Sequence, residues 1–204
     1  MKLYVERSMT YAGYLQLIEE LLAEGKTTGT NQSDKMKHYA ELNRQRMKRL
    51  EKTIELSPEV VFAARSAERP MIWLTLTEGW CGDAAQNIPV IEKIAAESDI
   101  IETRYLLRDE NLELMDRFLE NGSRAIPRLI ALDAQSLEVL GTWGSRPRVA
   151  QELYVDMRSG GIEKAVILEE MQRWYNADHT ESLQAEFATL INAWDRSQVL
   201  SAAI

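Results

Sequence analysis

The spacing of apolar residues changes near residue 71 and divides the chain into a helical part and a mixed part. Before that point, apolar side chains recur every three or four residues, which is the period of an amphipathic helix. Pro58 suits the first turn of a helix, where its missing N–H is not needed. The pattern predicts helices at residues 10–24, 34–55 and 58–69. Residues 1–57 are therefore expected to form a helical extension.

From residue 71 the pattern alternates between strands and helices. Residues 71–77 form a short apolar run rich in β-favouring side chains, which is typical of a buried strand. The elements predicted after it are helix 81–97, strand 100–107, helix 110–121, strands 128–132 and 137–143, and helices 147–158, 162–176 and 180–196. The alternation implies a parallel strand pair with a right-handed crossover, and the two closing strands imply an antiparallel hairpin. The fold class expected is α/β with a mixed central sheet.

Composition narrows the class of protein. The chain has 204 residues, of which 45% are hydrophobic and 27% charged, so a sizeable core can form. A formal net charge of −8 argues against binding to nucleic acid, which needs a basic surface. No apolar run approaches the roughly 18 residues of a membrane span, and the N-terminus lacks the apolar core of a signal peptide. With one cysteine and hence no intrachain disulfide, the expected location is the reducing cytoplasm.

The single cysteine, Cys81, follows strand 71–77 and begins the next helix. A helix N-terminus presents free N–H groups and the positive end of the helix dipole, which favour a thiolate. Cys81 is therefore a candidate nucleophile. Asp83 adds negative charge nearby and should oppose thiolate formation. Ala84 occupies the position where a second thiol would stand, so any disulfide chemistry must be of a monothiol kind.

Several motifs together resemble the thioredoxin superfamily. They occur in that family's order over residues 58–161. They are Trp80-Cys81-Gly82, Pro89 within the following helix, Asp109-Glu110-Asn111, Ala125-Ile126-Pro127 and Gly144. With the Trp-Cys-Gly-Asp sequence and the N-terminal extension, the chain is similar to an uncharacterised bacterial thioredoxin-like subfamily.

The resemblance implies a thioredoxin-like core over residues 58–161, with extension 1–57 before it and a helical hairpin, 162–204, packed on it. It implies a cis peptide bond before Pro127, facing Cys81. The substrate groove would comprise Trp80, Gly82, Asp83, Ala84, Ile126, Pro127, Arg128 and Gly144. The sequence departs from the family at Ala84, at Thr75, where thioredoxin carries a buried acid, and at Arg128 after the proline.

Two functions remain open. The first is monothiol chemistry on a protein or small-molecule disulfide, with Cys81 resolved by an external thiol such as glutathione. Arg128 would either reach the groove and stabilise the thiolate, or point to solvent or a carboxylate. The second is a pseudo-thioredoxin that binds peptides or proteins without turnover.

No resident cofactor or metal is expected. The motif of the monothiol glutaredoxins that hold iron–sulfur clusters, Cys-Gly-Phe-Ser, does not occur, and His38 and His179 form no cluster with Cys81. The sequence leaves the oligomeric state open.

Overall fold

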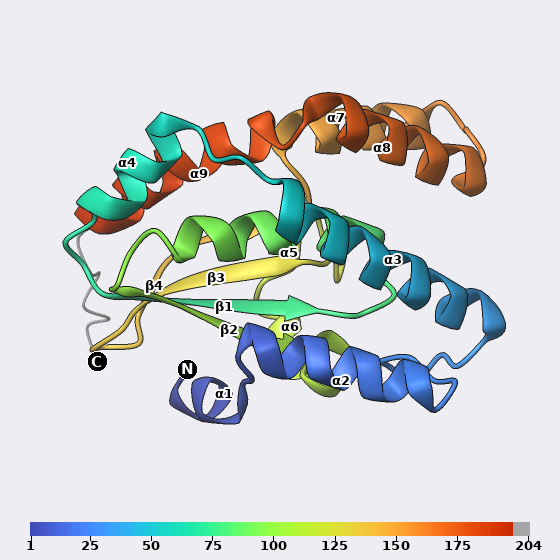
Figure 1. Ribbon diagram of the computed structural model, residues 1–204, viewed down its shortest axis with the longest axis horizontal. Coiled ribbons are helices and arrows are strands. Elements are labelled where there is room, and N and C mark those ends of the chain that lie inside the picture. The colour runs from blue at the N-terminus through green and yellow to red at the C-terminus, as the bar shows by residue number, and fades with distance from the viewer. Residues whose placement is uncertain (198–204) are drawn as a thin grey trace.

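The computed structural model describes residues 1–197 and has a four-stranded mixed sheet at its centre (Figure 1). The strands are β1 (Met71–Thr77), β2 (Ile101–Leu107), β3 (Arg128–Asp133) and β4 (Val139–Gly144), in the order β2-β1-β3-β4. β1 runs parallel to β2 and antiparallel to β3, and β3 and β4 form an antiparallel hairpin. Every residue of β1 is buried, as a central strand requires. The predicted α/β fold with a mixed sheet is confirmed.

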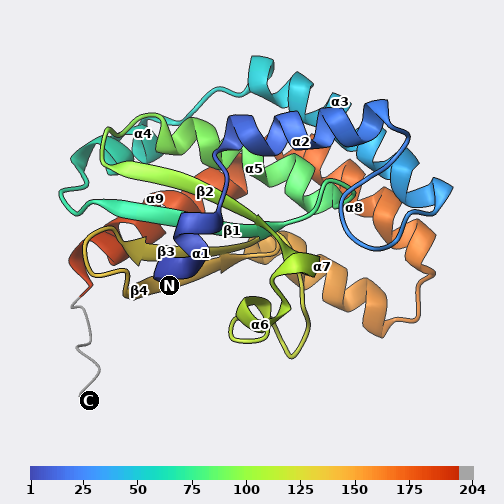
Figure 2. The same ribbon diagram turned by 90° about the horizontal axis from the view of Figure 1, so that it is seen from below.

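The helices of the described part surround this sheet. They are α1 (Lys2–Arg7), α2 (Tyr11–Ala23), α3 (Asp34–Thr53), α4 (Pro58–Ser66), α5 (Gly82–Ala95), the short 3₁₀ helix η1 (Arg108–Glu110), α6 (Leu112–Met115), α7 (Arg148–Ser159), α8 (Lys164–Asp178) and α9 (Glu181–Arg196). α5 lies along one face of the sheet and is covered by α3, whereas α1 and α6 lie on the other side (Figures 1 and 2). Thr10 and Ser57 cap α2 and α4 with their side chains, which fixes where those helices begin.

The helix predicted at 110–121 is wrong in its length. The chain forms η1, then the four residues of α6, and then turns. Asn111 leaves the helical region with φ −132° and donates its side-chain amide to the carbonyl of Leu107 at 2.8 Å, which separates the two short helices. Leu119 remains exposed, so a longer helix would have no continuous apolar face to bury. Helix α1 was not predicted from the sequence. Two residues after α1 ends, the backbone of Met9 pairs with that of Tyr105 at the edge of β2.

The C-terminal helix α9 shares the core of the sheet. Phe187 and Ile191 are fully buried, and Trp73 of β1 contacts Phe187 and Trp194 edge-on at centroid distances of 5.3 and 5.9 Å. α8 lies instead beside the N-terminal half of α5, where Tyr175 bonds to Asp83. The two C-terminal helices therefore meet the core at different places, and α8 reaches the segment that carries the cysteine.

Candidate functional site

Cys81 is the N-cap residue of α5, directly after the turn that follows β1. Only 7% of it is exposed. Its thiol donates to the carbonyl oxygen of Ile126, with the sulfur 3.3 Å from that oxygen. The next peptide bond, Ile126–Pro127, is cis. The structure therefore brings the sulfur against the proline loop, two segments that lie 45 residues apart in the sequence.

Burial decides the charge of this thiol. Burial and, next, the charge of the neighbouring Asp83 raise the pKa of Cys81 to about 12, against the backbone N–H groups of Ala84 and Asp83 and the charge of Arg146, which lower it. The helix N-terminus acts in the direction expected from the sequence but is outweighed by the loss of solvent. At neutral pH the resting thiol is protonated.

Asp83 lies at the centre of a buried polar cluster. Its carboxylate forms an ion pair with Arg146 at 2.7 Å and accepts a hydrogen bond from the Tyr175 hydroxyl at 2.9 Å. Asn87 in turn donates to the oxygen of Tyr175 at 3.0 Å. Burial raises the pKa of Asp83 in spite of Arg146 and Tyr175, which oppose the rise. Sequence reasoning found Asp83 but missed Arg146 and Tyr175, because nothing local marks them.

Arg128 does not reach the sulfur. Its guanidinium donates to the carbonyl of Gly144 at 3.3 Å and to the hydroxyl of Thr142 at 3.1 Å, so it bonds to β4. From the sequence, Arg128 could stabilise the thiolate, point to solvent or pair with a carboxylate. The side chain bonds instead to a carbonyl and a hydroxyl of β4. Gly144 itself does lie against the proline loop: a Cβ at this position would be 2.1 Å from the carbonyl oxygen of Pro127, at a φ of +132°. Only glycine permits that approach.

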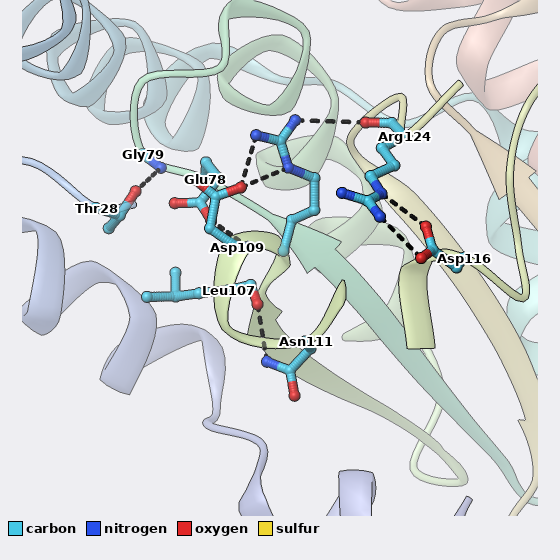
Figure 3. Close-up of polar contacts among 9 residues, drawn as sticks. Thr28, Glu78, Gly79, Leu107, Asp109, Asn111, Asp116 and Arg124 are labelled. Atoms are coloured by element: carbon cyan, nitrogen blue, oxygen red, sulfur yellow. Dashed lines mark hydrogen bonds and ion pairs between the residues drawn. The ribbon is translucent and has the colours of Figure 1, made fainter. Parts of the chain in front are cut away.

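The N-terminal extension covers the tryptophan side of the motif. Thr28 accepts a hydrogen bond from the backbone N–H of Gly79 at 2.8 Å, and Asn43 of α3 donates to the carbonyl of Gly79 at 3.1 Å. Figure 3 shows Thr28 at Gly79, beside Glu78 and Asp109. The turn that leads into Cys81 is thus held at both the N–H and the carbonyl of Gly79 by residues of the N-terminal extension.

Two side chains of this turn carry unused polar atoms. Glu78 is fully buried, and one of its oxygens accepts from the backbone N–H of Asp109 at 2.9 Å. Its other oxygen and the indole N–H of Trp80 find no hydrogen-bond partner among residues 1–197. Burial raises the pKa of Glu78, although the hydrogen bond from the backbone N–H of Asp109 opposes the rise. Thr75 is buried too, so β1 supplies no carboxyl to the site.

α8 covers the opposite side of the motif. Gln172 accepts a hydrogen bond from the amide of Gln86 at 2.8 Å, and its own amide nitrogen is 3.5 Å from where a Cβ of Gly82 would be. Ala84 is buried beneath it, with no polar atom to offer. Of the predicted groove, Ile126 contacts Cys81 and Gly144 contacts Pro127, whereas Gly82 and Asp83 face α8.

The described residues define two further properties. Among residues 1–197, no three or more His, Cys, Asp or Glu side chains are grouped so that they could hold a metal ion. Over the same residues, no helix has the length and apolar character needed to cross a membrane.

Comparison with known proteins gives one family and two similar structures. A family model described as thioredoxin matches residues 29–159. A crystal structure of PA1234, a protein of unknown function from Pseudomonas aeruginosa, superposes with a TM-score of 0.61 at 15% identity, covering 93% of this chain and 95% of that one. An HIV epitope scaffold superposes with a TM-score of 0.53 at 18% identity, covering 90% and 98%. At such identities these structures show the fold alone. No curated protein matches the sequence.

Proposed function

Because the chain belongs to the thioredoxin family, we propose that it performs thiol–disulfide chemistry of a monothiol kind through Cys81. The observation that carries this proposal is the position of the sulfur, which caps α5 and lies 3.3 Å from the carbonyl oxygen beside the cis-proline. A disulfide entering there would meet the sulfur, Trp80 and Pro127. The proposed setting is a bacterial cytoplasm, where low-molecular-weight thiols keep cysteines reduced.

The reaction follows from the single thiol. Cys81 loses its proton, and its thiolate attacks one sulfur of the substrate disulfide; the sulfur–sulfur bond breaks and the other half leaves as a thiolate. With Ala84 at the resolving position, the mixed disulfide persists until an external thiol such as glutathione attacks it. That second exchange regenerates Cys81 and releases a disulfide between the external thiol and the bound half.

The resting thiol sets the rate of this chemistry. With a pKa of about 12, the thiolate is on the order of one molecule in 100,000 at pH 7. Exchange is therefore expected to be slow at neutral pH and to accelerate steeply up to the most alkaline pH at which the protein stays folded.

The test is to incubate the full chain with glutathione disulfide and follow a glutathione adduct on Cys81 by intact mass, with Cys81→Ser as the blank. Adding reduced glutathione should remove the adduct. An adduct that never forms in the folded protein at pH 9, although it forms after unfolding in urea, contradicts the proposal.

A second candidate is a binding module without turnover, which the buried and protonated thiol favours. In that case the segment around Ile126 and Pro127 binds an extended peptide and Cys81 is a packing residue. Cys81→Ala should then leave peptide affinity unchanged by calorimetry, in a protein that shows no thiol transfer. Loss of binding in this variant would refute the module and support the thiol chemistry.

A further inference from the structure

The geometry points to Arg146 as the residue that places positive charge for the Cys81 thiolate, with Asp83 masking that charge in the resting structure. This inference rests on the proposed thiol chemistry and concerns the same site. It replaces Arg128, the arginine that the sequence suggested, by one that lies two residues beyond Gly144 in the loop before α7.

Arg146 is fixed in place on several sides. Its guanidinium pairs with Asp83 at 2.7 Å, donates to the side chain of Gln151 at 2.8 Å and lies over the ring of Tyr154 at 4.0 Å from the centroid. Only 12% of its side chain is exposed. An arginine that is mostly covered and held in this way has a fixed direction of charge, because few of its rotamers remain available.

The loop that carries Arg146 contacts two segments next to Cys81, the proline loop and the first turn of α5. Gly144 packs on the carbonyl of Pro127, next to the Ile126 oxygen that accepts from the thiol. Arg146 reaches across to Asp83, which is two residues from Cys81 in the first turn of α5. The cation is therefore close to the only reactive sulfur of the chain.

Asp83 offsets the effect of this charge on the sulfur. Its carboxylate neutralises Arg146 and itself opposes ionisation of Cys81, whose pKa is raised first by burial and next by Asp83, while Arg146 lowers it. Opposite charges in a poorly solvated site interact strongly, so removing one exposes the field of the other. Neutralising Asp83 should therefore leave Arg146 available to the thiolate.

Other charged and titratable groups face this cluster. Tyr175 of α8 donates to Asp83, and Glu120 adds negative charge near Asp83. On the far side of the sulfur, the hydroxyl of Tyr14 is buried and hydrogen-bonds with Thr77. Glu78, in the turn before Cys81, lies near Tyr14. Two other arginines border the site: Arg108 lies over the ring of Trp80 at 5.0 Å from the centroid and pairs with Asp109, and Arg128 bonds to β4. Arg146 is the cation that pairs with Asp83.

The experiment measures the alkylation rate of Cys81 by iodoacetamide across pH 6–10.5 in the full chain, with Cys81→Ser as the blank. Asp83→Asn keeps the shape of the side chain and removes its charge. We expect its alkylation rate to rise about tenfold at pH 7 and by the same factor across this range, because these pH values all lie below the midpoint of the thiol and a pKa lower by about one unit gives ten times more thiolate. Adding Arg146→Gln to this variant should abolish the gain.

Two matched variants complete the design. Arg148→Gln, added to Asp83→Asn, changes an exposed arginine two residues away and should keep the gain. Arg146→Lys, added instead, retains the charge and should keep part of it. Circular dichroism and urea midpoints verify that each variant is folded.

Three outcomes would overturn the inference. One is an alkylation rate of Asp83→Asn that does not exceed that of the natural protein at any pH of the range. Another is a gain that survives Arg146→Gln. The third is a gain that is lost with Arg128→Gln. Alkylation by iodoacetamide reports only the ionisation of Cys81. If the proposed disulfide exchange fails, iodoacetamide still labels Cys81 but glutathione disulfide forms no adduct on it, so the two failures can be told apart.

Discussion

The segment of residues 27–29, here called the strap, offers a sharp test of how the N-terminal extension holds the motif. Gly29 has a φ of +78°, and a Cβ built on it would lie 2.6 Å from Oδ2 of Asp109 and 3.2 Å from the indole nitrogen of Trp80. Asp109 cannot easily move aside, because Arg108 holds its other oxygen at 2.7 Å. Gly29→Ala should therefore push the strap away from Trp80.

Gly25 provides the matched control. Its φ is +67°, nearly that of Gly29, but a Cβ there would meet no atom within 4 Å. Both alanine variants carry the cost of a left-handed residue, about 1–2 kcal/mol, and both gain similarly from a less flexible unfolded chain. Gly29→Ala carries in addition the cost of overpacking, about 1–3 kcal/mol. The difference between the two variants isolates the contact.

The assay is urea unfolding followed by far-ultraviolet circular dichroism, with the free energy of unfolding taken from midpoint and slope. Gly29→Ala is expected to lose about 1–3 kcal/mol more than Gly25→Ala. Equal losses would refute the reasoning, because they would mean that the strap is not packed on Asp109 and Trp80.

Three further predictions concern packing, polarity and pH. Phe187→Ala removes a fully buried ring of α9 that contacts Trp73, so unfolding by urea should show a loss of about 3–5 kcal/mol; a loss below 1 kcal/mol would mean that α9 is not part of the core. Asn43→Ala leaves the carbonyl of Gly79 without its side-chain donor and should cost about 1–3 kcal/mol in the same assay. Burial raises the pKa of Glu78, so the protonated carboxyl group contributes to the stability of the fold. This contribution is fully present below the ordinary pKa of 4.5 and is lost as the pH rises through the pKa of Glu78 in the folded protein. The urea midpoint of Glu78→Gln should therefore rise relative to that of the natural protein between pH 4 and pH 8. A difference that stays constant over this range contradicts the raised pKa of Glu78.

Most elements of the fold could be predicted because their signals are local. Apolar spacing within a few residues identified the long helices, and the buried run of β1 identified the central strand. The exception at 110–121 has a local cause that apolar spacing does not reveal: the side chain of Asn111 bonds to the carbonyl of Leu107 and interrupts the helix. Side-chain hydrogen bonds of this kind compete with helix formation without altering the apolar pattern.

The site was predictable only in part. The motifs placed Cys81 and Pro127 in one groove because the family resemblance carries their relative position. The partners of Asp83 have no such signal: Tyr175 is 92 residues away, and Arg146 belongs to a loop with no recognisable motif. The sequence favoured Arg128, which directly follows Pro127, and only the packing of β3 on β4 directs its side chain toward Gly144.

The sequence by itself determined the order of helices and strands, the single thiol and its place at the start of α5. These depend on backbone preferences and amphipathic spacing, which act over a few residues. Tertiary structure alone decided that the thiol is buried, that Asp83 is paired with Arg146, and that α3 and α8 close over the motif. The physical reason is that the pKa of a group depends on solvent and charge around it, and both are supplied by segments distant in the chain.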